Sequence, residues 1–498
     1  MNNNDIKNIE PKEVFKWFEE ISKIPRESGN EKEISDFLVK FAEERNFEVY
    51  RDFANNVIIK KYGTFGYENK NAVIIQGHTD MVCEKTADSK HDFKNDEIEL
   101  IVEGDILRAN NTTLGADDGI AIAMGLAILD SKDIPHPPIE FLATTSEETG
   151  MDGALAIKGE NLKGKTLINI DSEEEGIFLV SCAGGLNAVA EFEIEKENLK
   201  DGFDEYLKIE IMGLKGGHSG IEIHKQRANA IKILGRLLYC VKKDINLVFI
   251  EGGSKHNAIA KDSKAIIIIK DADKTKYDRI KNILELSAQK IKNEYKTEDS
   301  QMQINIEKLK IEKLDKLDKV KESIGKCIKK EISDSIIDFM NLAPDGVLYM
   351  SRDIKGLVQT SANNGVLKEE NGKLIFTISI RSSIESSLEE AASVVEIAAK
   401  RTNAKFKRES EYPAWEYDKN SKIKDIALQV YKKITGKDAK VEAIHAGLEC
   451  GILKKVLPEV DMISFGPDIN AVHTPEEYLS ISSVERVWKF LKELIINL

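Results

Sequence analysis

Hydrophobic and polar positions follow two periodicities along this chain, one of helical spacing and one typical of buried strands. Apolar residues recur at helical spacing over residues 13–44, and short apolar runs at 56–60 and 71–76 predict strands. Helical and strand patterns then follow one another as far as residue 170. They predict helices at 119–129 and 153–157, and strands at 139–144 and 166–170. This alternation predicts an α/β fold with a mainly parallel sheet.

The pattern changes after about Gly184. Longer polar strands such as 207–212 and amphipathic helices such as 227–242 follow. A Lys-rich stretch at 308–330 contains interleaved Glu and Asp, which favours a solvated helical surface over a basic binding arm. From about residue 411 the earlier pattern returns, with a helix at 421–435, a strand at 460–465 and a closing helix at 484–496.

The length agrees with more than one domain. The 498 residues are several times the usual domain length, and the 41% hydrophobic content allows each domain its own core. We predict that residues 1–186 and 407–498 form one α/β domain, with a mainly parallel mixed sheet flanked by helices. Residues 187–406 are predicted to form an inserted α+β domain.

The charge composition disfavours two classes of binding partner. The chain has 72 Lys and Arg against 86 Asp and Glu, and its net charge of -14 repels phosphate backbones and anionic membrane surfaces. We therefore expect no nucleic acid and no membrane partner. The polar start at residues 1–15 and the lack of long apolar runs predict a cytoplasmic protein. The five cysteines form no C-x-x-C motif, which favours reduced thiols without a catalytic role.

Candidate chemistry begins where the predicted strand at 71–76 ends, in Gly77-His78-Thr79-Asp80. In extended chain, positions i and i+2 share a face, so His78 and Asp80 project together. A metal-bound imidazole needs its other N–H held by an acceptor, and Asp80 is placed to provide one. His-x-Asp alone is weak evidence for a metal site.

Two pairs of adjacent carboxylates follow. Asp117 and Asp118 lie in a glycine-flanked loop at the head of the predicted helix 119–129, where Asp118 would also suit a helix N-cap. We favour metal binding for Asp117 over a purely structural role. Glu147 and Glu148 follow a buried strand and precede Gly150. One of them can bind metal, while the other, with a raised pKa, can take a proton from water.

Two further residues complete the set. Asp171 ends the strand at 166–170, at the edge of an open α/β sheet where ligands collect, and His473 precedes the last helix. Singly, each also suits a turn residue or a hydrogen-bonded core histidine. Together, two histidines and several carboxylates at successive strand ends predict a site for two Zn²⁺-like ions that share a bridging Asp, with one Glu left as a base.

These motifs resemble the M20 metallopeptidases, and within them the aminoacyl-histidine dipeptidase group. The segments 77–80, 115–119, 146–150 and 169–171 occur in the order of that family. More specific to the group are segments 216–220, 356–366, 380–383 and 445–450. The resemblance spans nearly the whole chain. It implies a zinc-exopeptidase-like catalytic domain with an inserted lid domain, and metal-dependent hydrolysis of dipeptides.

The resemblance also implies roles for individual residues. One metal would be held by His78, Asp117 and Asp171, and the other by Asp117, Glu148 and His473, with a cis peptide after the bridging Asp117. The general base would be Glu147, and Asp80 and His218 would assist catalysis, with His218 donating to the oxyanion. The implied substrate-binding residues are Asn257, Arg381 for the terminal carboxylate, His445 and Gly447. A surface role for Arg381 stays open, because nothing local demands a buried anion.

The sequence leaves alternatives for the metal ions, the substrate, the activity and the assembly. The two ions would most simply be Zn²⁺, although Mn²⁺ and Co²⁺ also suit these ligands. An N-acyl amino acid deacylase of the same family would use the same site on another substrate. A non-catalytic binding protein on a dead hydrolase scaffold is disfavoured, because the ligands and the base are all present. Related enzymes imply either a homodimer, in which lid residues come from a second subunit, or a doubled lid within one chain, and of these the homodimer is favoured.

Overall fold

The computed structural model describes residues 6–199, 204–309 and 325–498. The chain divides into two compact units. The first comprises Met1–Cys182, Trp415–Ala443 and Leu448–Leu498, and the second comprises Ala183–Ala414 and Ile444–Gly447. Most of the Lys-rich stretch predicted to be helical, residues 310–324, lies outside the described residues. The described residues beside it form strands β14 and β15 and the start of helix α9.

The first unit is built on a mixed sheet. Its four central strands, β6, β3, β7 and β21, run parallel, and β2 and β8 flank them in antiparallel pairing. The mixed sheet flanked by helices agrees with the predicted fold class. In spatial order the strands are β1 (Glu48–Arg51), β2 (Val57–Lys61), β6 (Ile139–Thr144), β3 (Val73–His78), β7 (Thr166–Asn169), β21 (Asp461–Ser464), β8 (Ile177–Cys182) and β20 (Lys440–Ile444).

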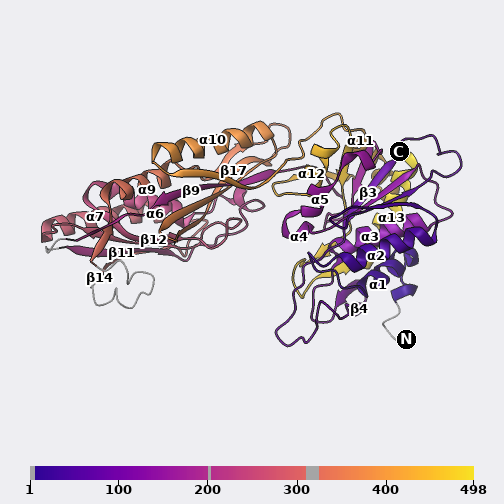
Figure 1. Cartoon of the computed structure of the whole chain (residues 1–498), viewed down its shortest axis with the longest axis horizontal. Helices are drawn as coiled ribbons and strands as arrows, with labels where there is room; N and C mark the ends of the chain where they lie inside the picture. Colours follow the sequence, from indigo (N-terminus) through magenta and orange to yellow (C-terminus); the bar gives the residue numbers. More distant parts are fainter. Residues whose placement is uncertain (1–5, 200–203, 310–324) are drawn as a thin grey trace. The chain divides into compact units, whose positions relative to one another are not determined.

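Helices pack with this sheet around one hydrophobic core (Figure 1). The helical pattern at 13–44 forms two helices rather than one, because Pro25 lacks a backbone donor and Gly29 adopts a positive φ of 85°. The core helices are α1 (Lys12–Ser22), α2 (Lys32–Glu44), α3 (Ala116–Asp130), α11 (Lys422–Thr435) and α13 (Ile481–Asn497). Shorter helices are α4 (Glu147–Gly150), α5 (Asp152–Ala156) and α12 (Glu449–Val456).

A second, small sheet in the first unit supports the segment that carries His473. Its strands, in spatial order, are β22 (Ile469–Asn470), β23 (Tyr478–Ser480), β5 (Ile106–Ala109) and β4 (Leu100–Glu103). Because β22 and β23 pair with each other, residues 471–477 form the loop between them. The C-terminal part of the chain is thereby joined to the segment just before α3.

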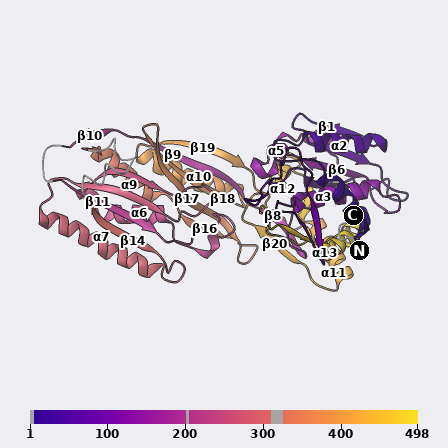
Figure 2. The same ribbon diagram turned by 90° about the horizontal axis from the view of Figure 1, so that it is seen from below.

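The second unit is an antiparallel sheet covered by helices (Figure 2). The strand order is β14 (Gln303–Leu309), β11 (Glu205–Met212), β13 (Ser263–Ile269), β12 (Asn246–Gly252), β17 (Val358–Glu370), β18 (Lys373–Ser382), β9 (Gly184–Glu193) and β19 (Lys405–Tyr412), with β16 (Gly346–Met350) also paired to β17. The helices are α6 (Ala230–Val241), α7 (Lys274–Glu294), α9 (Lys330–Leu342) and α10 (Glu385–Arg401). Strands β10 (Lys196–Asn198) and β15 (Lys326–Ile328) pair separately.

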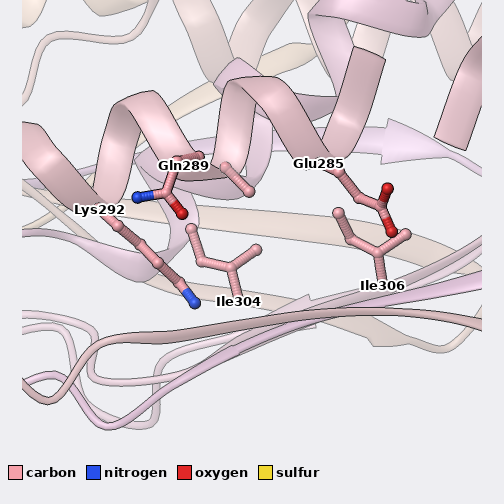
Figure 3. A pocket seen from close by; sticks show the side chains of 6 residues that line it. Glu285, Gln289, Lys292, Ile304 and Ile306 are labelled. Carbon is pink, nitrogen blue, oxygen red and sulfur yellow. The ribbon is translucent and has the colours of Figure 1, made fainter. Parts of the chain in front are cut away.

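One surface pocket of the described chain carries none of the predicted chemistry. A pocket of about 140 Å³ lies between α7 and β14, and its lining mixes Ile304 and Ile306 with Glu285 and Lys292 (Figure 3). None of the predicted site residues lines it. Across the described ranges, no helix combines the length and apolarity that crossing a membrane requires.

Candidate metal centre

Three parallel strands of the first unit bring the predicted ligands together. His78 is the last residue of β3, and its neighbour β6 runs directly into Glu147 and Glu148. On the other side of β3, strand β7 ends two residues before Asp171. Since the carboxyl ends of parallel strands meet at one edge of a sheet, residues from three distant segments converge there.

The ring of His78 is oriented by Asp80. Its Nδ1 lies 3.1 Å from the backbone carbonyl oxygen of Asp80, and because a carbonyl only accepts, Nδ1 carries the hydrogen. Its Nε2 faces two carboxylates, 3.1 Å from Oδ1 of Asp117 and 3.6 Å from Oδ1 of Asp171. The predicted pairing of His78 with the Asp80 side chain is longer, at 3.3 Å.

Asp117 lies between the two histidines. Its Oδ1 faces His78, whereas its Oδ2 lies 3.1 Å from Nε2 of His473. The same nitrogen of His473 lies 2.9 Å from Oε1 of Glu148. One carboxylate that presents an oxygen to each histidine has the arrangement required of a ligand shared by two cations. The peptide bond between Asp117 and Asp118 is cis, as predicted.

The donor set fits metal ions better than hydrogen bonding alone. Within the described part of the chain, the buried Oε1 of Glu148 has no hydrogen-bond donor, although His473 Nε2 lies close to it. Ligands bound tetrahedrally to Zn²⁺ stand roughly 3.4 Å apart, and the contacts here span 2.9 to 3.6 Å. Three groups have ligand atoms within 4.8 Å of one another: His78, Asp118 and Asp171; His78, Glu147 and Glu148; and Asp117, Glu148 and His473.

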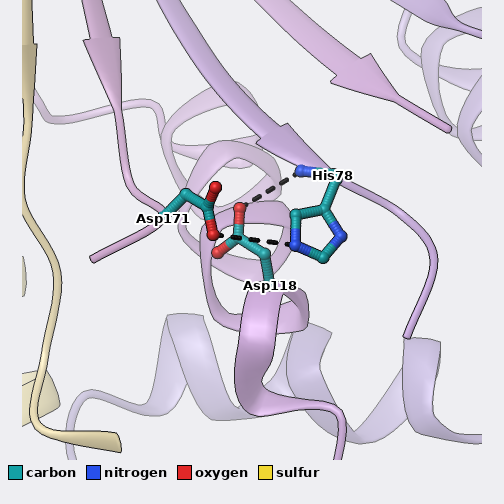
Figure 4. A group of neighbouring side chains, drawn as sticks. All are labelled: His78, Asp118 and Asp171. Carbon is teal, nitrogen blue, oxygen red and sulfur yellow. Dashed lines mark hydrogen bonds and ion pairs between the residues drawn. The ribbon is translucent and has the colours of Figure 1, made fainter. Parts of the chain in front are cut away.

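Asp118 occupies a place that the sequence did not predict. Asp118 has non-helical backbone angles and directly precedes the regular part of α3, but among the described residues its carboxylate makes no hydrogen bond that caps this helix. Its carboxylate instead accepts the backbone N–H of His78 at 3.1 Å and lies beside Asp171 (Figure 4). The close approach depends on Gly77, because a Cβ there would stand 2.6 Å from Oδ2 of Asp118. Through this hydrogen bond, Asp118 stabilises the carboxyl end of β3.

The electrostatics of the cluster favour a cation. Burial raises the pKa of Glu147 well above its ordinary value, and burial also raises that of Asp171 to about 6. Contacts with Asp117 and Glu148 raise the pKa of His473 to about 11. Negative charge therefore accumulates in a buried space, where any positive charge, a proton or a metal ion, is stabilised.

Asp80 holds the two glutamates in place. Its carboxylate oxygens accept the backbone N–H of Glu147 at 3.1 Å and that of Glu148 at 3.2 Å. The Oγ of Ser28 donates to the same carboxylate at 2.7 Å. Burial raises the pKa of Asp80, but its contacts with His78 and these donors outweigh burial and lower it to about 2. Asp80 therefore remains ionised and fixes the turn after β6.

A buried polar network beside the candidate metal ligands was not predicted from the sequence. Glu449 is fully buried, and its Oε2 accepts from Nε2 of Gln76 and from Oγ1 of Thr144, both at 2.6 Å. Gln76 in turn accepts from Asn169 at 2.7 Å. Burial raises the pKa of Glu449 to about 7. Gln76 and Asn169 each stand two residues before a predicted ligand, and alternation along a strand places them on the same face as that ligand. This spacing is the one feature of the sequence that could have indicated the network.

The buried Arg26 was also missed. Its guanidinium donates to the carbonyl oxygens of Thr79 and Asp80, at 3.1 and 3.2 Å, and to that of Gly115 at 2.6 Å. It thus joins the segment after β3 to the turn before α3. Only its position just after Pro25, in the break between two helices, sets it apart in the sequence.

The second unit contains its own cluster around His218. Nδ1 of His218 accepts the backbone N–H groups of Gly220 and Ile221, both at 3.1 Å. Burial lowers its pKa, so the ring is neutral and its hydrogen resides on Nε2. A Cβ at Gly220 would lie 3.2 Å from Cε1 of His218 and 3.3 Å from Cδ of Arg381, which shows how closely these side chains converge.

The other predicted substrate residues lie near this cluster. Arg381 donates from Nη1 to the Tyr412 hydroxyl at 2.8 Å, and its buried Nε has no acceptor among the described residues. The Nε2 of His445 lies 2.8 Å from Oγ of Ser361, and burial lowers the pKa of His445 to about 3. The backbone carbonyl oxygen of Asn257 accepts the backbone N–H of Ser219. Gly447 is the last residue of the segment 444–447, which also contains His445.

The chain was compared with known proteins. Residues 74–497 match the model of peptidase family M20/M25/M40. The cytosol non-specific dipeptidase of Escherichia coli (strain K12) is 36% identical over 493 residues, which cover 99% of this chain and 98% of that one. The crystal structure of aminoacylhistidine dipeptidase from Vibrio alginolyticus superposes with a TM-score of 0.90 at 34% identity, covering 99% and 98% of the two chains.

A more distant structure, aminopeptidase PepT from Bacillus cereus, has a TM-score of 0.54 at 14% identity and covers 98% of each chain. At that identity the likeness concerns the fold alone. The predicted family is confirmed by the match over most of the sequence. This chain belongs to peptidase family M20/M25/M40.

Proposed function

We propose that this protein is a metal-dependent dipeptidase that hydrolyses the amide bond of dipeptides. The observation that carries the proposal is the position of Asp117, whose two carboxylate oxygens face His78 and His473 at 3.1 Å each. The names of the E. coli and Vibrio relatives support dipeptides as the substrate class. A deacylase acting on N-acyl amino acids is not favoured by these comparisons.

The donor set accommodates two divalent ions. His78, Asp117 and Asp171 would hold one, and Asp117, Glu148 and His473 the other. Zn²⁺ suits two imidazoles and several carboxylates, and Mn²⁺ and Co²⁺ are the alternatives. When bound, such ions supply the positive charge that polarises the scissile carbonyl and lowers the pKa of the attacking water.

Glu147 acts in this proposal as the general base. Burial raises its pKa, which gives the carboxylate the affinity to accept a proton from water. Its backbone is fixed through the hydrogen bond to Asp80. The carboxyl group then gives that proton to the leaving amine, so Glu147 returns to its starting state within one turnover.

Residues of the second unit are assigned to the substrate. The Nε2–H of His218 donates to the oxygen that becomes negatively charged when water attacks. The guanidinium of Arg381, with its free Nε–H, receives the terminal carboxylate of the dipeptide. His445, Gly447 and Asn257 are assigned to the same substrate pocket. A cytoplasmic location, supported by the name of the E. coli relative, and a homodimer belong to this proposal as predictions.

The test is hydrolysis of a small panel by the purified protein, before and after treatment with a chelator and re-addition of Zn²⁺ or Mn²⁺. The panel contains Gly-His, β-Ala-His, Leu-Leu, a tripeptide and an N-acetyl amino acid. We expect cleavage of dipeptides that the chelator abolishes and metal restores. Cleavage of the acetylated compound alone would establish the deacylase instead, and an inactive, metal-loaded protein would refute both enzymes.

A further inference from the structure

A single buried carboxylate joins the two loops that carry Asp117 and His473. Glu477 lies four residues after His473, in the loop between β22 and β23, and only 2% of it is exposed. Its Oε2 accepts the backbone N–H groups of Leu114 and Gly115 at 2.9 and 3.1 Å. Its Oε1 accepts those of Ala116 and Asp117 at 2.8 and 3.4 Å.

The N–H groups of Ala116 and Asp117 lie in the first turn of α3, where no intrahelical acceptor exists for them, and those of Leu114 and Gly115 directly precede the helix. No side chain at the N-cap, Gly115, caps the helix. Glu477 supplies that acceptor from a segment more than 350 residues away in the sequence. Glu477 therefore fixes the distance between the turn before α3 and the loop that carries His473.

Asp117 and His473 face each other across this same distance between the turn and the loop. Oδ2 of Asp117 and Nε2 of His473 are 3.1 Å apart, although their backbones belong to the two segments that Glu477 connects. The loop of His473 adopts unusual backbone angles, with φ of 52° at Ala471 and 62° at His473. A loop in such a conformation needs support from its surroundings.

We infer that Glu477 is a positioning residue, which sets the distance between Asp117 and His473 and so controls how tightly the group Asp117, Glu148 and His473 holds its metal ion. The inference rests on the proposed metal centre. His78 and Asp171 stand at the ends of β3 and β7, outside the loop that Glu477 holds. The effect should therefore be greater for one ion than for the other.

The first test is zinc binding by calorimetry to the full-length protein after removal of metal. Glu477→Gln removes the charge and one acceptor at nearly constant volume. We expect the affinity for one of two equivalents to fall by about 10- to 100-fold, the usual effect of losing a group that holds a ligand in place. The other equivalent should stay close to wild type, and His473→Asn should weaken the same equivalent.

Glu476→Gln is the matched control, since Glu476 is the exposed neighbour in the same loop. It should bind both equivalents like the wild type. If Glu477→Gln does not fold, Glu477→Asp keeps both acceptors on a side chain one methylene shorter and should show a smaller loss for the same equivalent. Unchanged affinities in a folded Glu477 variant, or equal losses for both ions, would overturn the inference.

A second readout does not depend on metal. Hydrogen exchange of the metal-free protein should be slow at the amides of residues 114–117 and faster in the Glu477 variant, with Glu476→Gln unchanged. Equal exchange in both variants would contradict the role of Glu477. If the wild type shows slow exchange but takes up no Zn²⁺, the proposed metal centre fails while the contact of Glu477 with the turn stands.

Discussion

Oδ2 of Asp117 lies 3.1 Å from Nε2 of His473, although 356 residues separate them in the sequence. The contact joins the turn before α3 to a loop near the C-terminus. With Glu148, this carboxylate and imidazole form a candidate site for a cation.

Replacing Glu147 with Gln should abolish the proton acceptor without disturbing the ligands. We expect kcat to fall by about 10²- to 10⁴-fold, the usual contribution of general acid–base catalysis. The zinc content, measured by elemental analysis, should match the wild type. Glu174→Gln alters an exposed glutamate and serves as the control. A Glu147→Gln enzyme of normal kcat would remove Glu147 from the mechanism.

His218→Leu removes the Nε2–H donor assigned to the oxyanion. Because that donor acts mainly on the transition state, kcat should fall by about 10²- to 10³-fold while KM changes little. His224, an exposed histidine in the same segment, provides the comparison variant His224→Leu, for which wild-type kinetics are expected. A rise in KM alone would show that His218 serves binding rather than catalysis.

Arg381→Met should distinguish substrates that have a terminal carboxylate from those that lack one. Loss of a hydrogen bond to a charged group corresponds to about a 10- to 150-fold drop in kcat/KM for a dipeptide. The corresponding dipeptide amide should be affected far less. Arg352, which is exposed, gives the control Arg352→Met. Equal losses on both substrates would argue that Arg381 has a structural role instead.

Glu449 should make stability depend on pH. Burial raises its pKa from 4.5 to about 7, so between these values the folded protein holds a proton that the unfolded chain releases. Stability contributed by this group is therefore present at low pH and is lost as the pH rises through 7.

The measurement is the melting temperature of metal-free protein at pH 5 and pH 8. Glu449→Gln should lose less stability than the wild type between the two values, by at most about 3 kcal/mol. Glu459→Gln, at an exposed site, should behave as the wild type. An unchanged pH dependence in Glu449→Gln would show that Glu449 is ionised in the folded protein.

Local patterns determined the central strands and the long helices of the first unit. The strand predicted at 139–144 has those bounds, and the predicted helix at 421–435 differs by one residue. Short-range alternation also predicted that His78 and Asp80 act together. Such features depend on neighbours within a few residues, for which the sequence contains the full information.

Only the tertiary structure decided which distant groups meet. The sequence suggests only a helix cap for Asp118, but in the fold its carboxylate accepts the N–H of His78. Glu449 and Glu477 were not singled out, because nothing near them in the sequence indicates burial. Their partners, Gln76 and the turn at 114–117, lie hundreds of residues away. Contacts of that range arise from packing of the whole unit, which no local periodicity encodes.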